Sequence, residues 1–144
     1  MPGHPDRGRF LARLFFHTSE IQPSFKRWFY PHRFSTDSVA GRQKVMDAAY
    51  DMLIERWGVL DSMLESDGPY HLGETFSLLD MHMAMWANYG LKTGEDILQA
   101  FPAVNRVYEA AAARPASGHH LLKQKEQIAR WRGRVEHLQG ENEY

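Results

Sequence analysis

Apolar residues recur along this chain at steps of three and four, which places them on one face of an α-helix. The first such stretch is residues 5–29. Pro23 lies inside it and predicts a kink, because proline lacks a backbone donor and clashes with the preceding turn. A second helix is expected to begin between Ser35 and Ser38 and to run to about Ser66. It carries two apolar stripes, which predicts that it packs on two sides, either centrally or at an oligomer interface.

Three more helices are expected after a turn at Asp67-Gly68-Pro69. Residues 78–89 are apolar nearly all round, which predicts a buried central helix. Pro102 is suited to open the next helix, which Arg114-Pro115 closes. A last helix begins near Ser117. The pattern therefore predicts an all-α bundle of about five helices.

Length and composition support a single helical domain over residues 1–144, with a linker-like start at 1–5 and a frayed tail at 139–144. The content of 43% hydrophobic and 12% aromatic residues is enough to form a core. A net charge of −1 argues against a general nucleic-acid binder. The absence of cysteine excludes disulfides and thiol nucleophiles, and no apolar run is long enough to span a membrane. We therefore expect a cytoplasmic protein.

The histidines and methionines give no metal-site pattern. His119 and His120 are adjacent, so in a helix their side chains point about 100° apart and cannot chelate from one face. No two histidines have the i,i+4 spacing in a predicted helix, so we expect surface histidines and no metal. The run Met81-His82-Met83-Ala84-Met85 could suggest a soft metal, but its place in an apolar helix favours core packing.

The clearest local motif is a capping box at the start of the predicted central helix. Ser77 is the N-cap and Asp80 is the third helical residue, while Phe76 and Met81 occupy the positions of a hydrophobic staple. We interpret Asp80 as a folding element, and a catalytic acid or base is the alternative. The last helix is basic, which indicates a solvated face or, alternatively, a surface for an anionic partner; its basic residues are Lys123, Lys125, Arg130, Arg132 and Arg134.

Three segments, in this order, resemble the C-terminal domain of cytosolic glutathione transferases, particularly bacterial ones. The most specific is GPYHLGETFSLLD at residues 68–80, which is similar to the turn and capping box of that family. The stretch from Phe101-Pro102-Ala103-Val104 to Ala113-Arg114-Pro115-Ala116 looks like the family's next helix. Residues 14–23, followed by Phe29-Tyr30-Pro31, are similar to the first helix.

The resemblance spans about Pro5 to Leu138 and implies that half of a transferase is missing. Family members begin with a thioredoxin-like domain that holds most of the glutathione site and the residue that activates its thiol. Here residues 1–6 resemble the linker between the domains. We therefore expect no catalytic residue in this chain, and glutathione as a cofactor only if a thioredoxin-like domain is supplied.

The resemblance also implies positions for a binding site on the first helix. Phe15, Ser19, Gln22 and Lys26 would line the pocket for the electrophilic substrate, and Glu20 would contribute to the glutathione site near a dimer interface. The alternative is that these five side chains simply cover an exposed helix face.

Three functions are compatible with this resemblance. The chain can be the electrophile-binding and dimerisation half of a transferase that relies on a thioredoxin-fold partner. It can instead be a non-enzymatic protein-interaction module, or a carrier that binds a hydrophobic ligand in an exposed groove. We also expect a homodimer through the first two helices, because exposed apolar surface such as Phe15 and Phe16 usually marks an interface.

Overall fold

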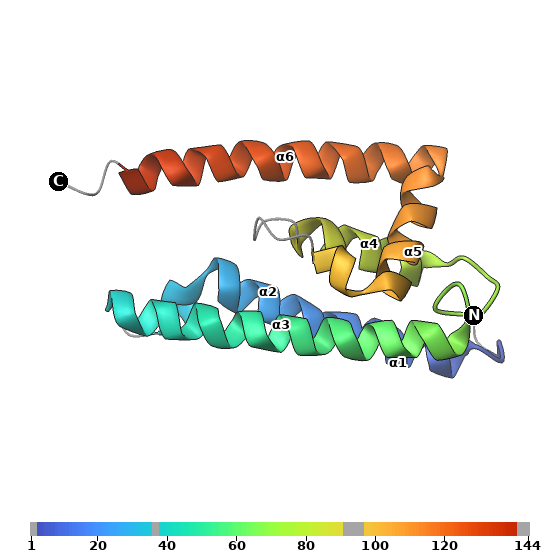
Figure 1. Cartoon of the computed structure of the whole chain (residues 1–144). Helices are drawn as coiled ribbons and strands as arrows, with labels where there is room; N and C mark the ends of the chain where they lie inside the picture. Colours follow the sequence, from blue (N-terminus) through green and yellow to red (C-terminus); the bar gives the residue numbers. More distant parts are fainter. Residues whose placement is uncertain (1–2, 36–37, 91–96, 141–144) are drawn as a thin grey trace.

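The computed structural model describes residues 3–35, 38–90 and 97–140, and its elements are helical, which confirms the expected all-α fold. The described α-helices are α1 (Arg7–Phe16), α2 (Gln22–Phe29), α3 (Val39–Asp67), α4 (Leu78–Gly90), α5 (Pro102–Ala113) and α6 (Pro115–Gly140). Short 3₁₀ turns η2 (Pro31–Arg33) and η4 (Ile97–Ala100) lie between them. Figure 1 shows α4 and α5 between the long helices α3 and α6, with α1 and α2 alongside α3.

Helices α1 and α2 form one continuous helical stretch, joined by the π-helical turn η1 (His17–Ile21). The N–H of Gln22 donates to the carbonyl of His17, five residues earlier. The wider turn lies directly before Pro23. In a regular α-helical turn, the proline ring would clash with the carbonyl group four residues earlier. The kink predicted at this proline is therefore a π turn, and the stretch begins at Arg7.

Helix α3 begins after Ser38, whose hydroxyl oxygen accepts a hydrogen bond from the N–H of Gly41 at 2.9 Å. Its buried face consists of Ala49, Leu53, Trp57, Leu60 and Leu64. On the second apolar stripe Val59 is exposed, whereas Val45, Met52 and Met63 are half-buried. Helices α2 and α5 pack against α3 and supply part of the same core cluster.

Helix α4 lies in the middle layer, as expected, and contacts α1, α5 and α6. Its neighbour α6 begins at Pro115, two residues before the expected Ser117, because proline suits a first helical position. The tail after Gly140 lies outside the described residues.

Two polar contacts hold the C-terminal end of α3 in place. The loop that carries the candidate site follows directly after this end. Arg13 of α1 forms an ion pair with Asp67, the last residue of α3. Arg106 of α5 donates to the carbonyl of Gly68 at 3.0 Å. Within the described part of the chain, no helix is both long and apolar enough to cross a membrane.

Candidate functional site

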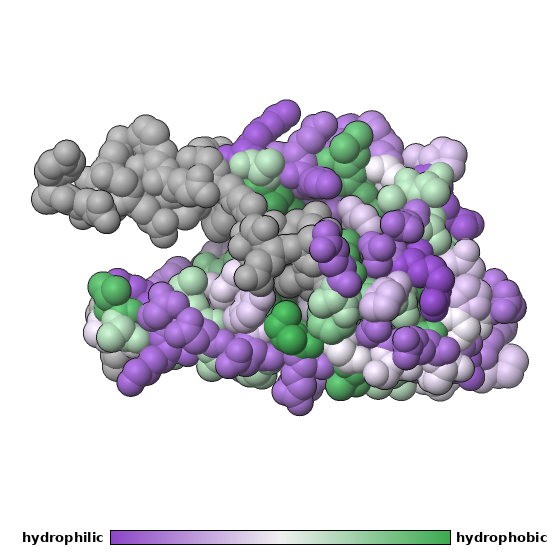
Figure 2. All heavy atoms as spheres, viewed as in Figure 1, coloured by the Kyte–Doolittle hydropathy of each residue, from purple (hydrophilic) through white to green (hydrophobic). Residues whose placement is uncertain are grey.

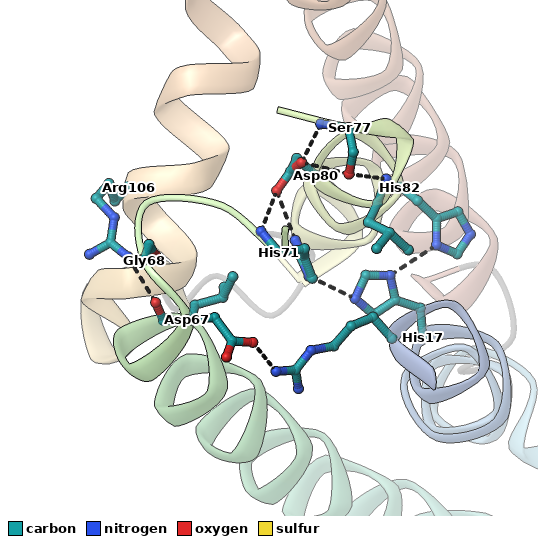
Figure 3. A network of polar contacts seen from close by, with 11 residues as sticks. His17, Asp67, Gly68, His71, Ser77, Asp80, His82 and Arg106 are labelled. Atoms are coloured by element: carbon teal, nitrogen blue, oxygen red, sulfur yellow. Dashed lines mark hydrogen bonds and ion pairs between the residues drawn. The ribbon is translucent and has the colours of Figure 1, made fainter. Parts of the chain in front are cut away.

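The loop between α3 and α4, residues 68–77, is shaped so that His71 turns inward. Gly68 and Gly73 adopt φ angles of 116° and 71°, which glycine tolerates without the strain that a side chain would add. Tyr70 and Gly73 exchange two backbone hydrogen bonds of 3.1 and 3.2 Å, which close the loop. The His71 side chain is only 1% exposed and faces the start of α4 (Figure 3).

Asp80 is fully buried and accepts four hydrogen bonds. Its Oδ1 accepts from the backbone N–H of His71 at 3.0 Å and lies 2.8 Å from Nδ1 of the same residue. Its Oδ2 accepts from the backbone N–H and the hydroxyl of Ser77 at 2.6 and 2.9 Å. Ser77 Oγ accepts from the N–H of Leu79 at 3.2 Å, so the hydrogen bonds of an N-terminal cap are present. Burial alone would raise the pKa of Asp80, but the hydrogen bonds from His71 and Ser77 outweigh it and lower that pKa.

His17, the first residue of the π turn, is also 1% exposed and lies between two other histidines. Its Nε2 is 3.1 Å from Nε2 of His71, and its Nδ1 is 3.2 Å from Nδ1 of His82 (Figure 3). The Nε1–H of Trp86 donates to Nε2 of His82 at 3.3 Å. Asp80, His71, His17, His82 and Trp86 therefore form one continuous row, here called the histidine network.

One set of neutral tautomers gives every N–H in the histidine network an acceptor. His71 donates its Nδ1–H to the Asp80 carboxylate, and its Nε2 then accepts the Nε2–H of His17. Nδ1 of His17 accepts the Nδ1–H of His82, whose Nε2 accepts from Trp86. Each imidazole donates once and accepts once, as a neutral imidazole must. All the hydrogen bonds thus point toward the single carboxylate.

The electrostatics of His17 and His82 match their neutral tautomers. Burial, followed by the neighbouring His71 and His82, lowers the pKa of His17 from 6.5 to about 2. Burial and the nearby His71 also lower the pKa of His82. Both rings are therefore uncharged at neutral pH, when the Asp80 carboxylate is ionised.

Two pockets adjoin the histidine network. The first lies between α4 and α6, has a volume of about 340 Å³, and is here called the α4–α6 pocket; it is lined by Leu78, Met81, His82, Met85, His120, Leu121 and Gln124. The second, of about 430 Å³, lies beside the start of α1 and the end of the loop; it includes Phe10, Leu72, Phe76 and Ser77. His82, at one end of the network, lines the α4–α6 pocket. Ser77, which is hydrogen-bonded to Asp80, lines the second pocket.

Comparison with models of known protein families shows which family the chain belongs to. The model for "Glutathione S-transferase, C-terminal domain" matches residues 29–115, which is more than half of the sequence. The chain belongs to this family. Comparison with curated proteins and with solved structures gives no match.

The residues that the resemblance placed in the binding site of this glutathione transferase C-terminal domain lie on the outside of α1, η1 and α2. Phe15 is 65% exposed, Ser19 and Lys26 are exposed, and Gln22 is half-buried. None of these four lines either of the two pockets described above. Glu20 accepts a hydrogen bond from Nε of Arg56 on α3 at 3.2 Å.

The sequence interpretation of the histidines missed the buried cluster of this transferase-type domain. His119 and His120 are exposed, as expected of surface histidines, but His17 and His71 are buried. His17 and His71 are 54 positions apart in sequence, so no local spacing reveals their contact.

The methionine run was assigned to the core, and Met81 does pack against the buried cluster of Ala84, Ala111 and Leu121. Met83 is buried, whereas Met81 and Met85 are half-buried and line the α4–α6 pocket. The reason is that α6 covers this face of α4 incompletely and leaves the pocket between the two helices.

No metal site is recognisable among the described side chains of residues 3–35, 38–90 and 97–130, where no three His, Asp or Glu residues are placed to hold an ion. The basic face of α6 is solvated as far as its side chains are described, because Lys123, Lys125 and Arg130 are exposed. The side chains of Arg132 and Arg134 lie outside the described part.

Proposed function

We propose that this domain binds an apolar small molecule in the α4–α6 pocket, as the electrophile-binding half of a bacterial-type glutathione transferase. The observation that carries this proposal is the composition of the pocket. Leu78, Met81, Met85 and Leu121 provide apolar walls, and nearly all of the surface that lines the pocket is apolar. A concave, mainly apolar pocket with few polar groups is the usual form of a small-molecule site.

Glutathione itself would bind only when a thioredoxin-like domain supplies its site, and we propose that this domain docks on the exposed face of α1, η1 and α2. Phe15 supports this placement, because a large, exposed apolar side chain is a common feature of an interface. Ser19, Gln22 and Lys26 would then line a separate pocket between the two domains, and Glu20 would face glutathione. A cytoplasmic location fits the absence of cysteine and the reducing conditions that keep glutathione as a thiol.

Titration with anilinonaphthalene sulfonate, a dye with apolar rings and one sulfonate whose fluorescence rises on burial, tests the pocket. Met85→Glu places a negative charge in the pocket wall and should weaken dye binding at least tenfold, because that charge is costly in an apolar site and repels the sulfonate. Leu122→Glu is the matched control, since Leu122 is exposed on α6 and is not among the lining residues. Equal affinity of both variants and the parent would contradict the proposed site.

A second candidate function is a protein-interaction module that works as a homodimer. The exposed large apolar side chains on the α1–α3 side of the molecule favour it; they are Phe15, Tyr30, Phe34, Val39 and Val59. Figure 2 shows apolar surface at the end of the molecule where α3 begins. Light scattering over a concentration series should give twice the monomer mass, whereas a constant mass near 16.7 kDa would rule out the dimer.

A further inference from the structure

Leu78, the first residue of α4, lines both of the pockets described above, so the two cavities meet at its side chain. The α4–α6 pocket extends from it along α4 toward Met85, and the second pocket extends from it toward Phe10 of α1. Leu78 is 68% exposed, whereas the next residue, Leu79, is fully buried. A large apolar side chain that is exposed where two apolar cavities meet is a feature of a binding surface.

The α4–α6 pocket has the length of a short alkyl chain. Leu78, Met81 and Met85 follow one another at steps of three and four, so they lie along one face of α4. The seven residues from Leu78 to Met85 span about 10 Å of helix, and roughly eight carbons of an extended alkyl chain, with bonds of about 1.5 Å, cover that distance. A longer chain in this pocket would therefore pass over Leu78 into the second pocket.

The linings of the two pockets differ in a way that orients such a chain. The surface of the α4–α6 pocket is almost wholly apolar, and the flexible thioethers of Met81 and Met85 adapt to the shape of an alkyl tail. The second pocket also has apolar walls, but it carries more polar surface. Its polar side chains include those of His4, Asp6 and Thr75. The apolar tail therefore fits the α4–α6 pocket, and the polar end fits the second pocket.

We infer that the two pockets form one site for a linear alkyl amphiphile with a chain longer than about eight carbons. The tail lies along α4 toward Met85, the middle of the chain covers Leu78, and the polar end lies in the second pocket. Such a ligand removes Leu78 from water, which accounts for the exposure of this side chain in the free domain. This inference rests on the proposed function and names its ligand class.

The test compares 1-octanol with 1-dodecanol, each below its solubility limit, by displacement of anilinonaphthalene sulfonate. Each methylene that leaves water for an apolar wall tightens binding about three- to fourfold. The four extra methylenes of dodecanol should cross Leu78, so dodecanol should bind roughly thirtyfold or more tightly than octanol. In a site that ends at Leu78 the extra carbons stay in water, and the two alcohols have equal affinities.

A variant of the second pocket alone separates the two halves of the site. Phe10→Glu places a charge in the wall of the second pocket and should remove most of the advantage of dodecanol, while the affinity for octanol is retained. Phe15→Glu is the matched control, because Phe15 lies on the same helix, is 65% exposed and lines neither pocket. It should keep the advantage of dodecanol.

Methyl NMR of the unmodified protein covers the case in which Phe10→Glu does not fold. Leu121 lines only the α4–α6 pocket and Leu72 only the second pocket. Octanol should shift the methyl signals of Leu121 alone, and dodecanol those of both residues.

Three results would overturn the inference. Equal affinities with shifts confined to Leu121 would leave the α4–α6 site standing without its extension. Shifts of both leucines by octanol, without a gain for dodecanol, would show two separate sites. Binding of neither alcohol would exclude alkyl chains as the ligand class, and the proposed function would fail as well only if the dye itself did not bind.

Discussion

Lowering the pH from 7 to 5 should destabilise this domain markedly, because His17 is buried as a neutral ring. The folded state holds this ring between His71 and His82, where an extra proton has neither water nor an anion beside it. The unfolded chain binds the proton freely. Acid therefore favours the unfolded state, and the free energy of unfolding must rise with pH across this interval.

The size of the effect follows from the two pKa values of His17, which are 6.5 when the chain is unfolded and about 2 when it is folded. Between these values each pH unit changes the free energy of unfolding by about 1.4 kcal/mol. At pH 5 the loss from this one residue is about 2 kcal/mol, and at pH 7 it is nearly zero. His82, whose pKa is also lowered, adds to the loss in the same direction. Asp80 adds to it only at pH values below its ordinary pKa of 3.8.

Urea unfolding followed by circular dichroism at pH 7, 6 and 5 measures this loss. His17→Gln keeps a polar side chain and removes the titratable ring, so its stability should fall by about 2 kcal/mol less than that of the parent between pH 7 and 5. His120→Gln, at an exposed position, should retain the parental pH dependence. A parent protein equally stable at pH 7 and 5, or a His17→Gln variant with the parental slope, would refute the buried neutral histidine.

Three further outcomes are expected. Ser77→Ala should lower the free energy of unfolding by about 1–2 kcal/mol, because the N-terminal cap of α4 is lost. Asp80→Ala should lower it by more, because the loss of the carboxylate leaves several buried donors unpaired. Chemical denaturation measures both changes. Gly118→Ala should lower the free energy of unfolding by more than about 2 kcal/mol, because its Cβ would lie 2.1 Å from the carbonyl oxygen of Ala112. Gly8→Ala meets no atom within 4 Å and should raise the free energy of unfolding by up to about 1 kcal/mol. The melting temperatures of the two variants should therefore move in opposite directions. The purified chain should not conjugate glutathione to an aryl halide, because we expect the group that activates the thiol on a thioredoxin-like domain, and turnover above the solution rate would falsify this.

The fold could be predicted from the sequence because its signals are local. The three-and-four spacing gives α3, and the Ser77-x-x-Asp80 motif gives the start of α4. The stripe of α3 also identifies the buried side chains, of which Trp57 is the largest. Pro23 indicated a distortion, but a kink and a π turn both relieve the same clash, so the proline alone does not distinguish them.

The candidate site could not be predicted in the same way, because it depends on where distant segments meet. His17 and His82 are 65 positions apart, and His71 reaches them only because Gly68 and Gly73 bend the loop inward. One signal was available. His82 interrupts the apolar run of α4 and His17 ends the apolar run Leu14-Phe15-Phe16, and a histidine on a buried helix face needs a polar partner.

Methyl NMR of methionine-labelled protein with naphthalene locates the ligand. Met81 and Met85 line the α4–α6 pocket, whereas Met46, Met52 and Met63 lie on α3, on the far side of the middle layer. Saturating naphthalene should shift the methyl signals of Met81 and Met85 and leave the three α3 signals in place. Unmoved signals from Met81 and Met85, or shifts confined to α3, would show that the pocket between α4 and α6 is not where this domain binds apolar molecules.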